Sequence, residues 1–167
     1  MGIIARNSDN LIDLLEVNLA AGYPLVDSPL THDFTPNMYI RSILMGEGTM
    51  HTSRCHNTCH PFNVSQGKLS VSINGSQWEY IEAPYNGITQ KGTRRILYIW
   101  EECVFTTYHF VPYITGEEQY FTKEEKEKLA AKIMEEILED YENKLLGGKL
   151  IGNVIHYKKN ELENAGR

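Results

Sequence analysis

A short segment near the middle of the chain gathers side chains that bind metals. Residues 55–60 read CHNTCH and hold two imidazoles and two thiols, which divalent transition metals accept as ligands. His56 and His60 are four residues apart, so in an extended chain their side chains lie on one face. We expect both to face one pocket and to form half of a site for Zn, Fe, Mn or Ni. The structural alternative is a pair of hydrogen-bonded histidines at a strand edge.

The remaining ligands of such a site must come from other parts of the chain. His109 is one candidate, because it lies on a predicted strand and shares a face with Phe105 and Thr107. Three carboxylates close to predicted strands are further candidates: Glu79, Glu101 and Glu102.

The two cysteines of the segment are interpreted differently from its histidines. Cys55 and Cys59 have the opposite parity, so in a regular strand they face away from His56 and His60. A structural zinc site draws its ligand pairs from two separated turns, and the chain has a single such cluster. We therefore expect two buried cysteines that act as small apolar residues. A cysteine nucleophile with a histidine base is the alternative, although nothing in the sequence orients the pair.

A basic cluster at residues 91–95 opens another predicted strand. Arg94 and Arg95 are neighbours, so their side chains diverge to opposite faces. The planar fork of an arginine suits phosphate or carboxylate. We expect one arginine to contact a ligand and the other to form an ion pair, for example with Glu101 or Glu102. The candidate ligand contacts of this region are three arginines and two aromatic residues: Arg54, Arg94, Arg95, Tyr98 and Trp100.

The elements that must position these residues are mostly strands. Residues 39–45 and 69–73 are predicted strands, the second from its clear apolar–polar alternation. Asn74-Gly75 predicts a two-residue hairpin turn, because both positions tolerate positive φ. Strands are also predicted at 95–100 and 103–111, joined by a polar turn at Glu101-Glu102. Many short strands of this kind are typical of a sandwich or barrel.

Two helices are expected to flank the strands. The first begins near Ser8 or Asp9, ends at Gly22, and is followed by an ordered arm to Pro36. The second begins with a capping box of Thr122 and Glu125 and ends at Gly147-Gly148. Their apolar stripes are Leu11, Leu14, Leu15 and Leu19 in the first, and Leu129, Ile133, Ile137, Tyr141 and Leu145 in the second. We expect one domain in three parts: 1–37 (helix and arm), 38–115 (β-barrel) and 116–167 (C-terminal helix and tail).

Composition excludes several classes of function. The chain has 167 residues and a formal net charge of −6, which argues against a nucleic-acid polymer as partner. No apolar run approaches the length of a membrane span, and the first residues do not resemble a signal peptide. Three cysteines do not make a disulfide framework. We expect a cytoplasmic protein with reduced thiols and no membrane partner.

Five stretches of the chain resemble the cupin superfamily: residues 48–50, 56–71, 83–85, 90–95 and 106–109. The resemblance is specifically to small single-domain cupin-like proteins of bacteriophages. In the first cupin motif, His56 matches a metal-binding histidine, His60 stands at the carboxylate position and Gly67 at the turn glycine. Arg54 replaces the other histidine of this motif, and Arg95 replaces the histidine of the second motif. The resemblance implies a mostly β, jelly-roll barrel in which Arg95 points inward.

Three functions remain open from the sequence. In the first, a pocket lined by His and Arg binds a small anionic ligand, such as a nucleotide or sugar phosphate, as a phage sequestering protein would. In the second, His56 and His60 hold a divalent metal in a cupin enzyme, and the metal acts as a Lewis acid or oxygen activator. In the third, the chain is a structural, oligomer-forming phage protein. We expect a homo-oligomer, located in the cytoplasm of a host cell if the protein is phage-encoded.

Overall fold

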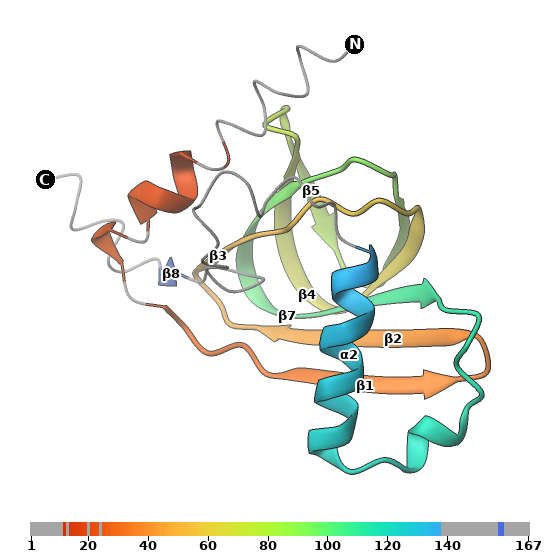
Figure 1. The fold of residues 1–167 in the computed structure, drawn as a ribbon. Helices are drawn as coiled ribbons and strands as arrows, with labels where there is room; N and C mark the ends of the chain where they lie inside the picture. Colours follow the sequence, from red (N-terminus) through yellow and green to blue (C-terminus); the bar gives the residue numbers. More distant parts are fainter. Residues whose placement is uncertain (1–11, 13, 20, 24, 138–156, 159–167) are drawn as a thin grey trace, which may run out of the picture.

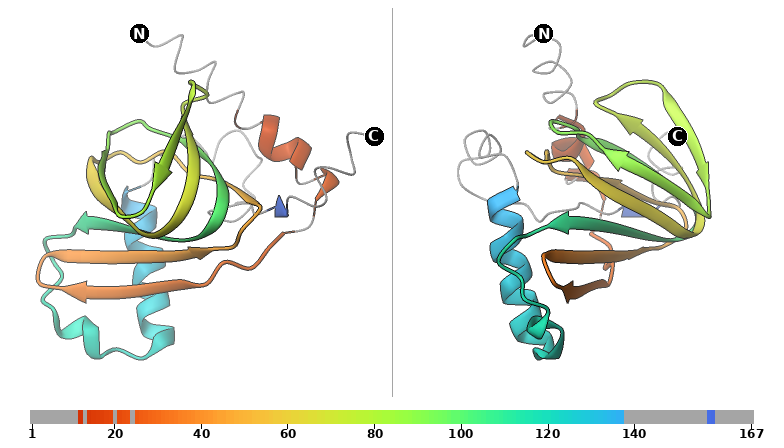
Figure 2. Two further views of the ribbon diagram at one scale, coloured as in Figure 1. Left: turned by 180° about the vertical axis from the view of Figure 1, so that it is seen from behind. Right: turned by 90° about the vertical axis from the view of Figure 1, so that its right-hand side faces the viewer.

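Two long antiparallel strands, β4 (His60–Ile73) and β7 (Arg95–Phe110), organise the structure. The computed structural model describes residues 12, 14–19, 21–23, 25–137 and 157–158 (Figure 1). β4 and β7 pair along most of their lengths, from Phe62 opposite Thr107 to Ile73 opposite Arg95. Both strands bend strongly, so the sheet curls into a barrel (Figure 2).

Shorter strands extend the sheet from both long strands. β1 (Leu30–Thr35) pairs with β2 (Met38–Met45), and β2 pairs with the second half of β7. β3 (Thr49–Thr52) pairs with the first half of β7 and with β8 (Tyr157–Lys158). β5 (Trp78–Glu82) and β6 (Tyr85–Thr89) both pair with β4. Every one of these pairs is antiparallel, so the prediction of a mostly β fold is confirmed.

A bulge at Gly67 lets both halves of β4 face the core. Its pairing with β7 shifts register around this glycine, which has a φ of +89°. A Cβ atom at Gly67 would collide with the backbone carbonyl of Glu102, so only glycine fits. The buried apolar residues and His60 have even numbers before the bulge and odd numbers after it: His60, Phe62, Val64, Leu69 and Val71. Gly67 was expected in a turn after the histidine segment, and the structure corrects this.

Two other predictions for the strands need correction. The predicted turn at Glu101-Glu102 is absent, because β7 continues through both residues as one strand. Both glutamates are exposed, and Glu101 Oε1 lies 2.6 Å from Lys68 Nζ. The predicted arm also contains a strand, β1, at the sheet edge. The predicted hairpin turn is confirmed, with positive φ at Asn74 (50°) and Gly75 (73°).

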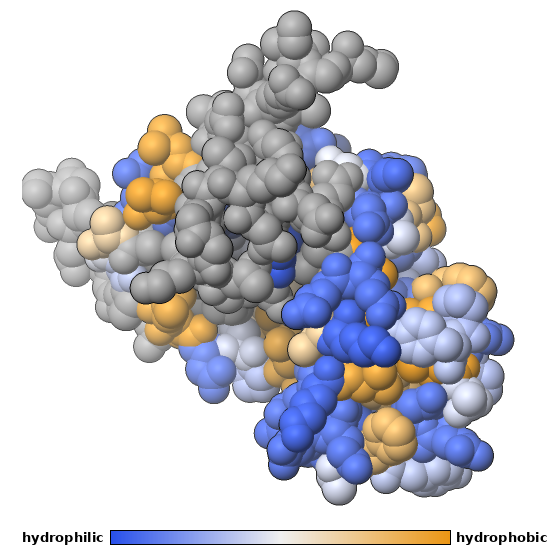
Figure 3. Space-filling model, in the orientation of Figure 1, coloured by the Kyte–Doolittle hydropathy of each residue, from blue (hydrophilic) through white to orange (hydrophobic). Residues whose placement is uncertain are grey.

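The C-terminal helix, α2 (Lys123–Ile137), follows the short 3-10 helix η1 (Glu117–Tyr120). Its capping box is confirmed: Thr122 N donates to Glu125 Oε2 at 2.8 Å, and Glu125 N donates to Thr122 Oγ1 at 3.3 Å. The apolar face packs into a buried cluster with residues of β1, β2 and the segment after β7: Phe34, Tyr39, Val111, Ile114, Ala130, Ile133, Met134 and Ile137. The outward face is hydrophilic (Figure 3).

Only part of each predicted helical stripe can be compared with the structure. Tyr141, Leu145 and the predicted end at Gly147-Gly148 lie outside the described residues. In the N-terminal helix, residues 14–19 and 21–22 are helical. Leu19 is buried, but Leu14 is 56% exposed, so the predicted stripe is wrong at that position. None of the helices in the described ranges is long and apolar enough to span a membrane.

Candidate metal and anion site

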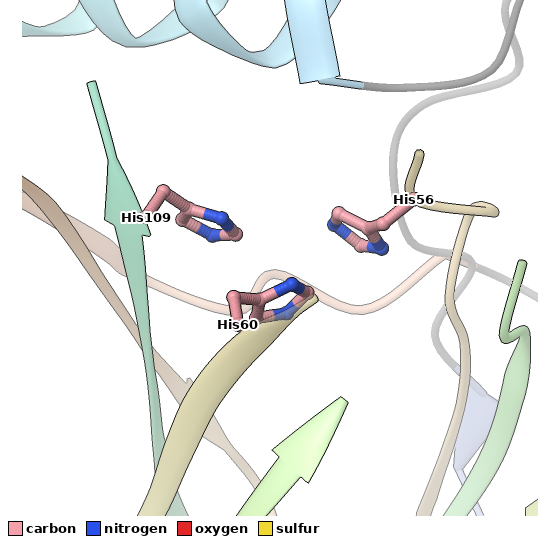
Figure 4. A group of neighbouring side chains, drawn as sticks. All are labelled: His56, His60 and His109. Carbon is pink, nitrogen blue, oxygen red and sulfur yellow. The ribbon is translucent and has the colours of Figure 1, made fainter. Parts of the chain in front are cut away.

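Three histidines from separate parts of the chain meet at one end of the barrel (Figure 4). His60 is the first residue of β4, His109 lies near the end of β7, and His56 belongs to the loop before β4. The ring centroid of His60 is 4.7 Å from that of His56 and 4.4 Å from that of His109. One ring nitrogen of each lies within 4.8 Å of the other two. His56 and His60 therefore face one pocket, as predicted, and His109 joins them.

The local backbone that achieves this differs from the prediction. Residues 53–55 are not part of a strand, and His56 makes only an isolated bridge. The backbone of this loop is held by Gly92 N, which donates to the carbonyl of His56 at 2.9 Å, and by Asn57 N, which donates to that of Ile137 at 2.9 Å. The second bond joins the loop to the end of α2. His56 therefore reaches the pocket through a loop rather than through strand parity.

Each of these imidazoles keeps a buried nitrogen that has no hydrogen-bond partner among the described residues: Nδ1 of His56, Nε2 of His60 and Nδ1 of His109. The other nitrogen is engaged in two of them. His60 Nδ1 donates to the Thr58 carbonyl at 3.4 Å, and His109 Nε2 bonds to Thr107 Oγ1 at 3.0 Å. Buried polar atoms are nearly always satisfied, so three unsatisfied nitrogens side by side point to a missing partner. A metal ion satisfies imidazole nitrogens held in this way.

Burial keeps these histidines neutral. Burial, followed by the neighbouring charges of His60, Arg95 and Arg41, lowers the pKa of His56 to about 3. Burial and Arg95 lower the pKa of His60 to about 4. Burial, followed by His60, His56 and Arg41, lowers the pKa of His109 to about 2. At neutral pH all three are therefore in the form that binds metals.

Two arginines face the same cavity. Arg95 on β7 is buried, and its Nη2 donates to Thr89 Oγ1. Its guanidinium carbon lies over the rings of Phe62, at 4.7 Å, and Phe105, at 5.8 Å. Burial lowers the pKa of Arg95 to about 10, and burial also lowers that of Arg41 on β2. Within the described part of the chain, no carboxylate forms an ion pair with either guanidinium.

The cavity between these residues has a volume of about 60 Å³. Apolar residues complete its wall: Ile43, Met45, Leu97, Phe105 and Met134. Met134 comes from α2, so the helix closes one side of the pocket. None of the described lining residues is acidic. The lining therefore combines neutral imidazoles with two positive charges and no compensating negative charge.

The other predicted ligand contacts lie elsewhere. Arg94 directly precedes β7, is buried and does not line the cavity; its Nη2 is 3.0 Å from Glu16 Oε1. Arg54 is partly exposed and does not line the cavity. Tyr98 and Trp100 pack edge to face, at 4.5 Å, on the same outer face as Arg94. Both were predicted as ligand contacts, and neither lines the cavity.

Sequence reasoning missed Arg41. It belongs to an alternating set on β2 whose other members are buried or line the pocket: Tyr39, Ile43 and Met45. That alternation was the available signal.

The structure adds a histidine to the cavity and places the predicted acidic ligands outside the cluster. His51, on β3, lines the cavity as well, and its Nε2 bonds to Thr49 Oγ1 at 2.7 Å. The predicted acidic ligands are exposed and lie outside the cluster: Glu79, Glu101 and Glu102. Cys55 is buried as predicted, but Cys59 is exposed, with its Sγ 3.4 Å from Gln90 Oε1.

The fold and the site together define an antiparallel β-barrel protein with a buried cluster of histidines and arginines. No family model matches the chain, and no curated protein matches its sequence. Similar solved structures include an RmlC-like cupin from Methanocaldococcus jannaschii, at 9% identity over 53% of this chain and 88% of that chain, with a TM-score of 0.41.

Two further structures are similar in the same way. Ectoine synthase from P. lautus has 14% identity over 56% of this chain and 72% of that chain, with a TM-score of 0.45. A cupin-2 domain protein from Shewanella frigidimarina has 14% identity over 57% and 91%, with a TM-score of 0.41. These are likenesses of fold at low identity, and we base no argument about function on them.

Proposed function

We propose that this barrel binds a divalent transition metal through His56, His60 and His109 and holds a small anion beside it. The observation that supports the metal is the cluster of three neutral imidazoles, each with a buried nitrogen that lacks a partner. Three protein ligands leave coordination positions open for a further ligand. A metal bound there would act as a Lewis acid on an oxygen of the bound anion. Zn, Fe, Mn and Ni all accept imidazole.

The anion is supported by the charges around the histidines. Arg41 and Arg95 contribute two positive charges to a cavity without an acidic residue in its described lining. A buried charge without a counter-charge is costly, and a divalent cation would add to the imbalance. An anion that contacts both the metal and the guanidinium groups would correct it. Arginine forms its strongest hydrogen bonds with carboxylate and phosphate oxygens.

The volume of the cavity limits the size of the ligand. Its volume of about 60 Å³ is roughly that of two water molecules in the liquid. Pockets for drug-sized ligands measure several times more, on the order of 300–1,000 Å³. We therefore propose a small anion, or the anionic head group of a larger molecule, rather than a whole nucleotide or sugar phosphate.

The metal is tested by titrating metal-free protein with Zn²⁺ in a calorimeter, and with Co²⁺ by visible absorption. We expect one metal ion per chain, with the absorption of Co²⁺ bound to nitrogen ligands. His109→Ala should lose this binding. The matched control is His32→Ala, because His32 bonds to the Tyr39 hydroxyl and lies outside the cluster. Metal binding that survives His109→Ala, or that fails equally in His32→Ala, would place the site elsewhere.

A further inference from the structure

A second cavity lies beside the first inside the barrel. It has a volume of about 90 Å³, and its lining includes the buried apolar residues Leu69, Val71 and Ile81. The exposed residues Glu79 and Ile88 also line it, so they form its rim. We call it the apolar chamber, and the cavity of the three histidines the histidine chamber. The apolar chamber has no place in the proposed metal and anion site.

The two chambers adjoin each other. Arg95, Leu97 and Phe105 line both of them. The Arg95 guanidinium is held at this boundary by one neutral hydroxyl, that of Thr89, and by the faces of Phe62 and Phe105. A carboxylate is a stronger partner for arginine than a hydroxyl. A ligand whose carboxylate meets Arg95 in the histidine chamber therefore has an apolar space directly behind that contact.

From this arrangement, and resting on the proposed function, we infer that the ligand is a short-chain monocarboxylate. Its carboxylate lies in the histidine chamber and its apolar tail in the apolar chamber. A cavity of roughly 150 Å³ holds benzene, which corresponds to a volume on the order of 25 Å³ for each carbon atom. A chamber of about 90 Å³ then accepts a tail of about three or four carbons.

The negative charge at the rim favours a ligand with one carboxylate over a ligand with two. Glu79 is the acidic residue that lines the apolar chamber within the described part of the chain. Its negative charge would repel a second carboxylate at the far end of the tail. A dicarboxylate of matching length is therefore expected to bind more weakly than the monocarboxylate.

The test is a calorimetric titration of zinc-loaded protein with sodium acetate, propionate, butyrate, pentanoate and hexanoate. Each buried methylene should tighten binding about fourfold. The gain should stop once the tail exceeds about four carbons, and glutarate should bind more weakly than pentanoate. Equal affinity for all chain lengths would overturn the inference. That result leaves the proposed function unaffected. Failure of acetate itself to bind would instead contradict the part of the proposed function that concerns the anion.

Substitutions at Val71 separate the apolar chamber from general effects on the core. Val71 is buried and lines only this chamber. Val71→Leu should abolish the gain with chain length and leave acetate binding unchanged. Val71→Ala should shift the chain length of tightest binding to a longer tail. This variant provides the test if the larger side chain of Val71→Leu prevents folding. Val64→Ala is the matched control, since Val64 is buried in the same core cluster and lines neither chamber. An unchanged series in both Val71 variants would contradict the assignment.

Discussion

Two neighbouring arginines at the start of β7 occupy opposite environments: Arg94 directly precedes the strand and Arg95 is its first residue. Arg94 and Arg95 are both buried, with 3% and 6% of their surface exposed. Arg94 faces outward and meets a carboxylate: its Nη2 is 3.0 Å from Glu16 Oε1 on the N-terminal helix. Arg95 faces inward and meets the Thr89 hydroxyl and two phenylalanine rings. Among the described residues, the protein thus supplies a carboxylate for Arg94 and none for Arg95.

This difference indicates that the two buried arginines have different roles. Around Arg94 the protein supplies each partner itself: its Nε also donates to the Ser53 carbonyl at 3.2 Å, and its backbone N donates to Asn74 Oδ1 at 2.8 Å. This arrangement ties the N-terminal helix to the barrel. Around Arg95 the missing counter-charge lies next to three histidines with unsatisfied nitrogens. We interpret the first environment as structural and the second as a binding site.

The largest expected effect distinguishes the two arginines by stability. Arg94→Met removes the counter-charge of the Glu16 carboxylate, whose side chain is 16% exposed and whose Oε1 also accepts from Thr52 Oγ1 at 2.6 Å. Breaking a buried ion pair in this way costs about 3–5 kcal/mol. Arg95→Met removes a charge that has no acidic partner in the described part of the chain, so the ligand-free protein should lose little stability or gain some. Urea unfolding of both variants without added metal or anion measures the difference.

The double variant Glu16→Gln with Arg94→Met sharpens this comparison. It should be more stable than Arg94→Met alone, because the side chain at position 16 then carries no buried charge that lacks a counter-charge from position 94. An equal loss of stability in Arg94→Met and Arg95→Met would remove the distinction on which the comparison rests.

The second expected effect is a loss of stability in acid. Below pH 6.5 the histidines of the unfolded chain take up protons. His56, His60 and His109 in the fold stay neutral, because their pKa values lie at about 3, 4 and 2. Protons therefore favour the unfolded chain, and stability should fall as the pH drops from about 6.5 towards 4. Each histidine contributes up to about 1.4 kcal/mol per pH unit over this range.

His109→Gln should flatten this dependence by the share of one histidine. Urea unfolding at several pH values between 7 and 4.5 measures the slope. The matched comparison is Thr122→Ala, which lowers stability at a site remote from the histidines. A slope that is the same in His109→Gln and the wild type would show that His109 is not buried in its neutral form.

Part of this comparison could be predicted from the sequence. Alternation along residues 95–99 groups Arg95 with Leu97 and Ile99, and the resemblance to the second cupin motif pointed that face inward. The capping box and the Asn74-Gly75 turn were also predictable, because both depend on residues close together in the chain. Tyr98 and Trp100 share the parity of Arg94, so the same alternation indicated that they lie outside.

The rest depends on contacts between distant parts of the chain. Glu16 and Arg94 are 78 residues apart, and no local pattern predicts that they pair. The bulge at Gly67 changes which residues of β4 face inward, and it is needed because β7 passes close to the glycine. Arg41 enters the site because β2 pairs with the half of β7 that carries His109. That pairing is a property of the whole sheet.

The smallest expected effect is the loss of a helix cap. Thr122→Ala removes the Oγ1 acceptor of Glu125 N at the start of α2. Loss of a helix cap of this kind costs about 1 kcal/mol. Metal and anion binding should remain unchanged, because α2 contributes Met134 to the pocket wall from a point well beyond its first turn. Thermal unfolding and a Zn²⁺ titration check both parts. A loss of metal binding in this variant would mean that any decrease in stability disturbs the site, which would weaken the conclusions drawn from the arginine variants.

The central claim is that an anion completes the charge around Arg95, and calorimetric titration of zinc-loaded protein with sodium acetate tests it most directly. The wild type, Arg95→Met and Arg94→Met are compared at a temperature where all three are folded. Hydrogen bonds to charged groups contribute about 1.5–3 kcal/mol, so Arg95→Met should bind acetate at least about tenfold more weakly than the wild type. Arg94→Met should bind it with unchanged affinity. Equal affinities in the wild type and Arg95→Met, or a loss confined to Arg94→Met, would contradict the account.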